Sequence, residues 1–442
     1  MNRATNPDEA FWALDPFHIV KPGDPFFVDL EAQFAARGYG LTAKLKRRLG
    51  SGRPTGRCQH VGIIGHKGVG KSTQVRKILA DLRPTGLAAV FVDPLAELDQ
   101  STLTFGDLIL LAVQGVTDWL EKQKLDIPAE EAELVRNWFA EELLGESHAR
   151  EILGSIEADT KSGIGIPFLA KITARLRGTL KSDSVYRREI RQRIDRNPEE
   201  LLDHANGFFD AARHSLTERS GKDARVCLVF DNLEKIGNRD LVADAVLRRA
   251  DDWQRLRCDL LFFFDPADQY FPHRARVGER FDTVAMPMLP IRGREDEPMQ
   301  LREEAVAAIR AFLEARMDLM SVFAEVEPAL RFLTSRSGGR LRDVMHLARA
   351  ACERASGDLI SMAELESASK YVASTLVTNA MPDHWPRLAQ IHRTKQVANR
   401  EDDAFFLQHS LVLDYNGEPW WDVHPLVMGD ERFQNALRAS EP

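Results

Sequence analysis

The chain has 442 residues, of which 44% are hydrophobic and 29% are charged, and its formal net charge at pH 7 is −8. At roughly 100–200 residues per domain, this length allows about two to four domains, and the composition is that of a globular protein. The negative balance excludes a protein that binds nucleic acid over its whole surface, although a local basic patch remains compatible with it.

The cysteines and the apolar runs favour a cytoplasmic protein. The N-terminal stretch MNRATNPDEAFWALDPF lacks the apolar core of a signal peptide. Apolar runs such as LILLAV at 108–113 are too short to cross a bilayer, so we expect no membrane partner. No C-x-x-C pair is present, which argues against a structural zinc site or a disulfide framework, and the cysteines are far apart: Cys58, Cys227, Cys258 and Cys352.

In the first two thirds of the chain, the pattern predicts an α/β fold. Residues 1–55 are rich in Pro, Gly and Phe and predict an ordered arm with a short helix. Residues 103–220 have mostly amphipathic helical spacing. The segment 282–291 is either a final short strand or an extended connection. Short apolar runs that end in Gly or Asp predict buried strands at 61–65, 88–93, 225–231 and 258–265.

The last third of the chain is predicted to be mainly helical. From about residue 296 to residue 378, the segment lengths are typical of a small helical bundle. Two further helical segments are followed by LVLDYNGEPWWDVHPLV. This stretch predicts a hairpin whose turn lies at Asn416 and Gly417.

Residues 65–73, GHKGVGKST, fit the phosphate-loop pattern G-x-x-x-x-G-K-[ST] between a strand and an amphipathic helix. The glycines let the backbone aim successive N–H groups at phosphate oxygens. Lys71 is expected to reach the β- and γ-phosphates, and Ser72 to ligate Mg²⁺. No guanine-reading N/TKxD motif is present, which favours ATP. We predict that ATP and Mg²⁺ bind at Gly65, Lys67, Gly68, Val69, Gly70, Lys71, Ser72 and Thr73.

A second acidic feature follows the strand at 225–231. Asp231 is expected to complete the Mg²⁺ site, partly through water, as phosphoryl transfer requires. Asn232 stands where many P-loop ATPases have a catalytic glutamate. Glu234 is then either the general base or a first-turn acid of the next helix. In the second case hydrolysis would be slow, and ATP would act chiefly as a switch ligand.

The order of these motifs resembles the AAA+ superfamily, and within it the branch of initiator-type and STAND-type ATPases. The matching pieces are GHKGVGKST, FDNLEK, FFFDPADQY, GERFDTVAMPMLP and SGGRLRDV, which cover about residues 60–350. The resemblance implies a P-loop NTPase fold: a parallel sheet with a large helical insertion, a helical lid and a C-terminal winged-helix-like domain. We expect an arm at 1–55, a core at 56–295 with its insertion at about 100–222, a lid at 296–378 and the winged-helix-like domain at 379–442.

The same resemblance implies further catalytic residues. Asp265 stands at the position of a γ-phosphate sensor, where Asn, Ser or Thr is commoner. Arg342, with Arg340 as second candidate, is expected to fold the lid onto the phosphates. Arg280 is the expected arginine finger, supplied to a neighbouring subunit, which implies a homo-oligomer. Two nearby alternatives for the finger are Arg274 and Arg276.

Two regions suggest partners. Residues 161–196 hold ten Lys or Arg against three Asp or Glu. This patch either meets nucleic acid or an acidic partner, or is a solvated helix face that pairs with nearby acids. His424 is expected to be a packed histidine rather than a metal ligand. The predicted wing is acidic and aromatic, which favours protein contact, at Asp414, Glu418, Trp420, Trp421 and Asp422.

Three functions remain open from the sequence. The first is an ATP-hydrolysing switch, with slow turnover, that oligomerises and regulates a separately encoded effector. WWDVHPLV resembles the ends of ATPases from bacterial conflict systems, which places this switch in antiviral defence. The second is a DNA-binding initiator or transposition-type ATPase acting on duplex DNA through the wing or residues 161–196. The third is a scaffold that nucleotide stabilises without being hydrolysed.

Overall fold

The structure is a computed structural model. Most of the basic stretch 161–196 lies outside the residues that it describes, as do Arg274, Glu418 and the predicted turn at Asn416 and Gly417. None of the described helices is long and apolar enough to span a bilayer. The described residues are 3–31, 40–50, 57–128, 171, 178, 185–271, 276–295, 300–415 and 420–439.

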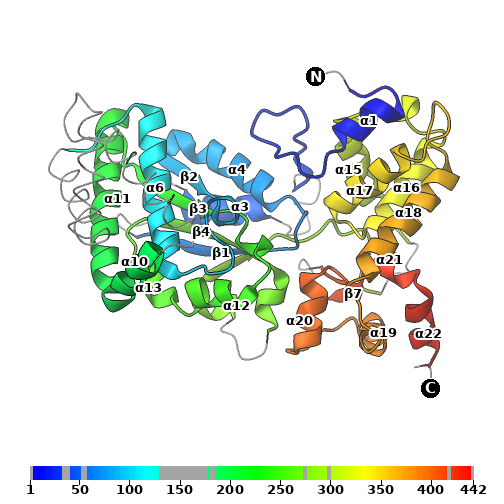
Figure 1. Ribbon diagram of the computed structural model, residues 1–442. Helices are drawn as coiled ribbons and strands as arrows, with labels where there is room; N and C mark the ends of the chain where they lie inside the picture. Colours follow the sequence, from blue (N-terminus) through cyan, green and yellow to red (C-terminus); the bar gives the residue numbers. More distant parts are fainter. Residues whose placement is uncertain are drawn as a thin grey trace.

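A five-stranded parallel sheet forms the centre of the first two thirds of the chain (Figure 1). The strand order is β2-β3-β4-β1-β5, so β4 separates the strand before the phosphate loop from the strand that ends at Asp231. The predicted strands are confirmed to within one residue at each end, and the uncertain segment 282–291 forms a strand over its first four residues. The strands are β1 (His60–Ile64), β2 (Leu87–Val92), β3 (Arg225–Phe230), β4 (Asp259–Phe264) and β5 (Asp282–Ala285).

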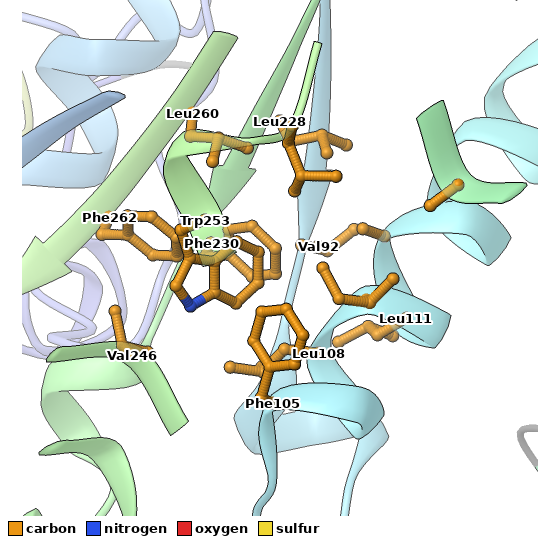
Figure 2. Close-up of a cluster of buried hydrophobic side chains, with 14 of the residues drawn as sticks. Val92, Phe105, Leu108, Leu111, Leu228, Phe230, Val246, Trp253, Leu260 and Phe262 are labelled. Atoms are coloured by element: carbon orange, nitrogen blue, oxygen red, sulfur yellow. The ribbon is translucent and has the colours of Figure 1, made fainter. Parts of the chain in front are cut away.

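Helices cover both faces of this sheet, which explains why its strands are nearly continuous apolar runs. One face packs against α3 (Leu41–Leu49) and α4 (Lys71–Leu82). The other packs against α6 (Phe105–Gln123) and α11 (Pro198–Ser220). On this second face, the fully buried indole of Trp253 lies between aromatic rings from the sheet and from α6 (Figure 2). Shorter helices complete this half: α5 (Pro94–Glu97), α10 (Val185–Arg196), α12 (Arg239–Val242), α13 (Ala250–Gln254) and α14 (Val277–Arg280).

A helical bundle with its own apolar core follows the sheet, as predicted. We call it the lid. The arm contributes to this core, because α1 (Pro7–Ala13) packs on the third lid helix and buries Ala10 and Leu14 there. Ala4 also exchanges backbone hydrogen bonds with the lid. The lid helices are α15 (Glu303–Glu314), α16 (Val326–Ser337), α17 (Leu341–Cys352) and α18 (Met362–Val377).

Residues 384–439, which we call the C-terminal module, combine helices with one antiparallel strand pair, as the sequence predicted. One expectation about it is wrong. Trp420 and Asp422 are buried inside the chain and are not free to meet a partner. Asp422 binds Arg292 and Lys395, and the Trp420 ring stacks on Tyr415. The elements are α19 (His384–Thr394), α20 (Glu401–Gln408), β6 (Val412–Asp414), β7 (Trp421–Val423), α21 (Pro425–Met428) and α22 (Glu431–Ala439).

Candidate functional site

The loop at 65–70 joins the carboxyl end of β1 to the first turn of α4, the place where open α/β sheets bind ligands. Gly68 and Gly70 have φ angles of 87° and 96°, which favour glycine. A Cβ at Gly65 would lie 2.6 Å from the carbonyl oxygen of Met286. The glycines of the motif are therefore required by backbone angle and by close packing.

Lys71 is buried at the start of α4. Its ammonium donates to the carbonyl oxygens of Gly65 at 2.6 Å and His66 at 3.0 Å. It also lies 3.6 Å from Oε1 of Glu234. Burial lowers the pKa of Lys71, although Glu234 and Asp265 oppose this. The ammonium is thus held in the loop by acceptors for which phosphate oxygens would compete.

The predicted metal ligands meet in the structure. The hydroxyl of Ser72 donates to Oδ1 of Asp231 at 2.6 Å. Sequence reasoning missed Arg76, whose guanidinium lies 3.1 Å from Oδ2 of Asp231 and 3.8 Å from the ring centroid of Phe91. Arg76 is four residues after Ser72 on α4, so both face the same side of the helix. This spacing was the available signal.

The two polar residues after Asp231 are turned in different directions. Asn232 has a φ of 65°, a left-handed conformation that Asn tolerates better than Glu. Its amide donates to Asp93 at the end of β2, at 2.6 Å. Glu234 lies in a short 3₁₀ turn and is buried near Lys71. Both residues line the cavity beside the phosphate loop, and the acid is the one that lies 3.6 Å from Lys71.

The charge of Glu234 is maintained despite its burial. Burial is the largest influence and favours the protonated acid, but Lys71, then a hydrogen bond from its own backbone N–H, and then Lys235 and Arg239 outweigh it and lower the pKa of Glu234. Its Oε2 atom has no hydrogen-bond partner among the described residues. An ionised, buried carboxylate with a spare oxygen can accept a proton from a water molecule.

Asp265 ends β4, between the phosphate loop and Asp231. Its Oδ1 accepts from the backbone N–H of Ala267 at 3.0 Å, and its Oδ2 has no partner among the described residues. Burial raises the pKa of Asp265 to about 6, against the opposing charge of Lys67. The candidate sensor is thus a buried acid that ionises with difficulty.

Both candidate arginines of the lid lie on the phosphate loop. The backbone N–H of Arg342 donates to the carbonyl oxygen of Gly68 at 3.1 Å, and a Cβ at Gly68 would lie 2.5 Å from that of Arg342. Nε of Arg340 donates to the carbonyl oxygen of Lys67 at 2.8 Å. Burial lowers the pKa of Arg342, and its Nε has no partner in the described part of the chain. The lid therefore touches the loop through backbone and through cations.

The C-terminal module also touches this loop, which the sequence did not indicate. The backbone N–H of Asp414 donates to Nε2 of His66 at 2.9 Å, and Val69 packs in a small apolar cluster that includes Leu413 and Trp420. Burial, followed by the charges of Arg340 and Lys71, holds the pKa of His66 well below its usual range. The imidazole is therefore neutral and acts as an acceptor.

The same module is fastened to the turn before α17. The hydroxyl of Tyr415 donates to the carbonyl oxygen of Gly338 at 3.0 Å. His424 is buried, with Nε2 2.9 Å from Oδ2 of Asp343. The prediction of a packed histidine at 424 is confirmed.

A cavity of about 290 Å³ opens beside the phosphate loop. It is lined by Gly68–Gln74, Asp231, Glu234 and Arg342, and its other wall is the arm. The sequence missed the role of the arm, because its apolar residues have no motif: Phe17, Ile19, Val20, Phe26, Phe27 and Val28. Arm residue Glu31 accepts hydrogen bonds from Thr42 and from Gln74 on α4, which fixes this wall to the sheet half.

Arg280 lies elsewhere. It is exposed and ends α14, just before the amino end of β5. The phosphate loop follows the carboxyl end of β1, which is parallel to β5. Arg280 therefore lies at the opposite edge of the sheet and does not line the cavity of its own chain.

The residues of the cavity fit ATP and Mg²⁺. The loop offers backbone N–H groups at two left-handed glycines, and Ser72 with Asp231 supplies the hard oxygen ligands that Mg²⁺ prefers. Buried polar atoms of opposite charge on either side, Oε2 of Glu234 and Nε of Arg342, have no partner in the described residues. A phosphate chain and its water would satisfy them.

Known proteins resemble this chain only remotely. No curated protein matches the chain. Orc1 of Aeropyrum pernix, solved with DNA, has 13% identity and a TM-score of 0.39, over 97% of this chain and 96% of that one. Cdc6p of Pyrobaculum aerophilum has 11% identity and a TM-score of 0.40, over 97% and 98%. Drosophila ORC bound to DNA has 12% identity and a TM-score of 0.39, over 91% and 77%.

A family model matches the first part of the chain. Residues 40–262, half of the chain, match the AAA ATPase domain. This range includes the phosphate loop, Asp231 and Glu234, together with the first three strands of the sheet and the start of the fourth. The chain therefore belongs to the AAA ATPase domain family.

Proposed function

We propose that the chain is an ATP-hydrolysing molecular switch in which the phosphate loop sets the positions of the lid and the C-terminal module. One observation carries this proposal: the loop is hydrogen-bonded to both parts at once, at Gly68 to Arg342 and at His66 to Asp414. A change in loop position on binding phosphate would displace both contacts.

The residues divide the catalytic work as follows. Lys71, Ser72 and Asp231 hold the phosphates and the metal, and Mg²⁺ when bound would neutralise phosphate charge. Glu234 accepts a proton from the attacking water. Glu234 is coupled to nucleotide binding through Lys71, which lies close to it. Once the ammonium of Lys71 engages a phosphate, it no longer holds the carboxylate of Glu234. Turnover is proposed to be slow even with Glu234 as the base, because this acid stands two positions beyond Asn232, whose own side chain is bound to Asp93.

The arm is proposed to hold the base of the nucleotide. Its apolar side chains face the cavity opposite Leu341 and Met345 of the lid. Apolar walls with a few fixed polar groups are typical of nucleotide pockets. Because α1 packs on the lid while Glu31 is bound to the sheet half, the arm also connects the two halves that nucleotide would bring together.

We further propose that the active form is a homo-oligomer that regulates a separately encoded effector. Arg280 is exposed on the far edge of the sheet, so it can reach only the cavity of another copy. We also propose the four domains expected from the sequence: the arm at 1–55, the core at 56–295, the lid at 296–378 and the winged-helix-like domain at 379–442. The resemblance to ATPases of bacterial conflict systems suggests antiviral defence as the setting, and the genes beside this one as the place to seek the effector.

A DNA-binding initiator is the second candidate. Arg188 and Arg196 of α10 are exposed, which favours a phosphate contact there. Arg191 of the same helix does not contribute, because it is bound to Asp107 and Thr102. Duplex-DNA affinity measured against salt concentration tests this candidate, and its slope counts the phosphates that are neutralised.

Light scattering after size-exclusion, with and without Mg²⁺-ATP, tests the switch. The switch predicts that ATP increases the mass of the particle and that Lys71→Ala abolishes this increase. Arg280→Ala should still assemble with ATP but should hydrolyse it slowly. An ATP-independent monomer that binds duplex DNA would favour the initiator. Equal hydrolysis in the wild type, Lys71→Ala and Asp231→Ala would mean that this site does not turn over nucleotide.

A further inference from the structure

A groove of about 550 Å³ follows the outer side of β2, away from the nucleotide cavity. Its walls are α4 on one face of the sheet and the C-terminal parts of α6 and α11 on the other. Figure 1 shows β2 with α4 and α6 beside it. The groove therefore passes round the edge of the sheet rather than into its core.

The strand at the floor of this groove offers main-chain groups. Among the described residues, β2 pairs with β3 and with no other strand. The carbonyl oxygens of Gly86 and Val92 accept hydrogen bonds from the side of β3. Along a strand, the main-chain N–H and C=O groups of successive residues point alternately to its two sides. The odd-numbered residues between Gly86 and Val92 therefore point these groups away from β3. These residues are Leu87, Ala89 and Phe91, and all three line the groove.

The charge of the groove is one-sided in a chain whose net charge is −8. Among the residues that the structure describes, no aspartate or glutamate lines it. Trp119 of α6 adds a partly buried aromatic surface. Arg219 also donates to the carbonyl oxygen of Gln123, and this bond leaves its other donors available. The lining cations are Lys21, Arg76, Arg83 and Arg219.

We propose that this groove docks an extended, acidic segment of a partner protein, which adds to β2 as a further strand. Outward main-chain groups supply the pairing, as in known modes of β-strand addition. The surrounding cations select acidic side chains. A nucleic acid would use the cations but not the strand edge, and a single tryptophan is no stacking series. The observations therefore favour a peptide.

Arg76 connects this groove to the candidate magnesium site. Its guanidinium lines the groove and lies 3.1 Å from Oδ2 of Asp231. A carboxylate of the docked segment competes with Asp231 for this cation. Removal of the cation from Asp231 increases the attraction between Asp231 and Mg²⁺. This second step rests on the proposed ATPase function, whereas the docking step does not.

The docking step is tested by fluorescence anisotropy on the full chain. The probe is a fluorescein-labelled peptide in which Val and Glu alternate over about ten residues, longer than a typical strand. We expect saturable binding, and no binding of a Val–Lys peptide or of the same peptide with a central proline. Arg83→Glu combined with Arg219→Glu should weaken binding roughly tenfold, without changing basal ATP hydrolysis.

The matched control is Arg438→Glu, an exposed arginine at the other end of the molecule, which should bind the peptide as the wild type does. Ala89→Pro removes one outward N–H group and should also weaken binding. Equal binding by the wild type and the double variant would overturn the proposal, as would no saturable binding at millimolar peptide. Binding of single-stranded oligothymidine, but not of the peptide, would assign the groove to nucleic acid.

The coupling step has a separate readout. The Mg²⁺ concentration that gives half-maximal ATP hydrolysis should fall severalfold when the peptide is added, and this fall should be absent in Arg76→Gln. An unchanged Mg²⁺ requirement in the wild type, with peptide bound, would overturn the coupling alone. If neither the wild type nor any variant hydrolyses ATP, the proposed function fails. The anisotropy data would still decide whether the groove docks the peptide.

Discussion

The lid and the C-terminal module meet the same phosphate loop in chemically different ways. The lid approaches with guanidinium groups, one of which has a buried Nε without a partner in the described residues. The C-terminal module approaches with a backbone N–H on a neutral imidazole and with apolar side chains around Val69. In the proposed switch, the first contact would respond directly to phosphate charge, whereas the second would respond only to the shape of the loop. The two parts would then read the same nucleotide through different properties.

The largest effect is expected at Lys71, because the response of both contacts to ATP depends on this residue. Lys71→Ala should lower ATP hydrolysis about 10³-fold, because a preorganised cation on the phosphates is lost. It should also remove the ATP-dependent change in both modules. Phosphate release measures the rate, and hydrogen exchange in α17 and β6 measures the modules. Lys77→Ala, which removes a lysine paired with Asp81 on the same helix, is the matched control; an equal loss in both variants would contradict this role.

Asp265 sharpens the comparison because it faces the loop from the sheet and belongs to neither module. Its folded pKa of about 6 exceeds the ordinary value of 3.8, so its contribution to stability is present at low pH and is lost as pH rises through 6. Between pH 4 and 7 the wild type should lose about 2 kcal/mol of unfolding free energy relative to Asp265→Asn. Urea unfolding at several pH values checks this. Parallel pH profiles would refute the assignment.

Arg342→Ala removes only a guanidinium group from the lid side, because the backbone N–H of residue 342 still donates to Gly68. ATP affinity should fall about tenfold, the usual size of a lost charge-assisted contact, and the contact of Asp414 with His66 should persist. Titration with a fluorescent ATP analogue gives the affinity. The control is Arg331→Ala, a lid arginine that is exposed and paired with Glu303. Loss of protection in β6 as well would mean that the two contacts are not independent.

His66→Ala breaks the other side and should have the smallest effect. It leaves the N–H of Asp414 buried without its acceptor, which costs about 1–2 kcal/mol. We expect faster hydrogen exchange in β6 and β7 and an ATP affinity closer to wild type than that of Arg342→Ala. His214→Ala, at an exposed histidine of α11, is the control. An affinity loss larger than that of Arg342→Ala would reverse the roles of the two contacts.

The features predicted from sequence are those that a short local pattern determines. The strands, the phosphate loop and the lid helices follow from apolar period and glycine position. The contact between His66 and Asp414 joins residues 348 positions apart, so no local pattern encodes it. The same is true of the arm as a cavity wall, whereas the position of Arg76 could have been inferred from its spacing after Ser72. The acidic, aromatic wing was misjudged, because composition does not distinguish an exposed acid from one buried against Arg292.

The central claim is that Glu234, and not Asn232, serves the hydrolytic water. Single-turnover hydrolysis of radiolabelled ATP by the wild type, Glu234→Gln and Asn232→Ala tests it most directly, with nucleotide binding measured in parallel. We expect Glu234→Gln to bind ATP but to hydrolyse it about 10²-fold or more slowly, and Asn232→Ala to lose much less. Wild-type hydrolysis by Glu234→Gln, at retained binding, would contradict the account.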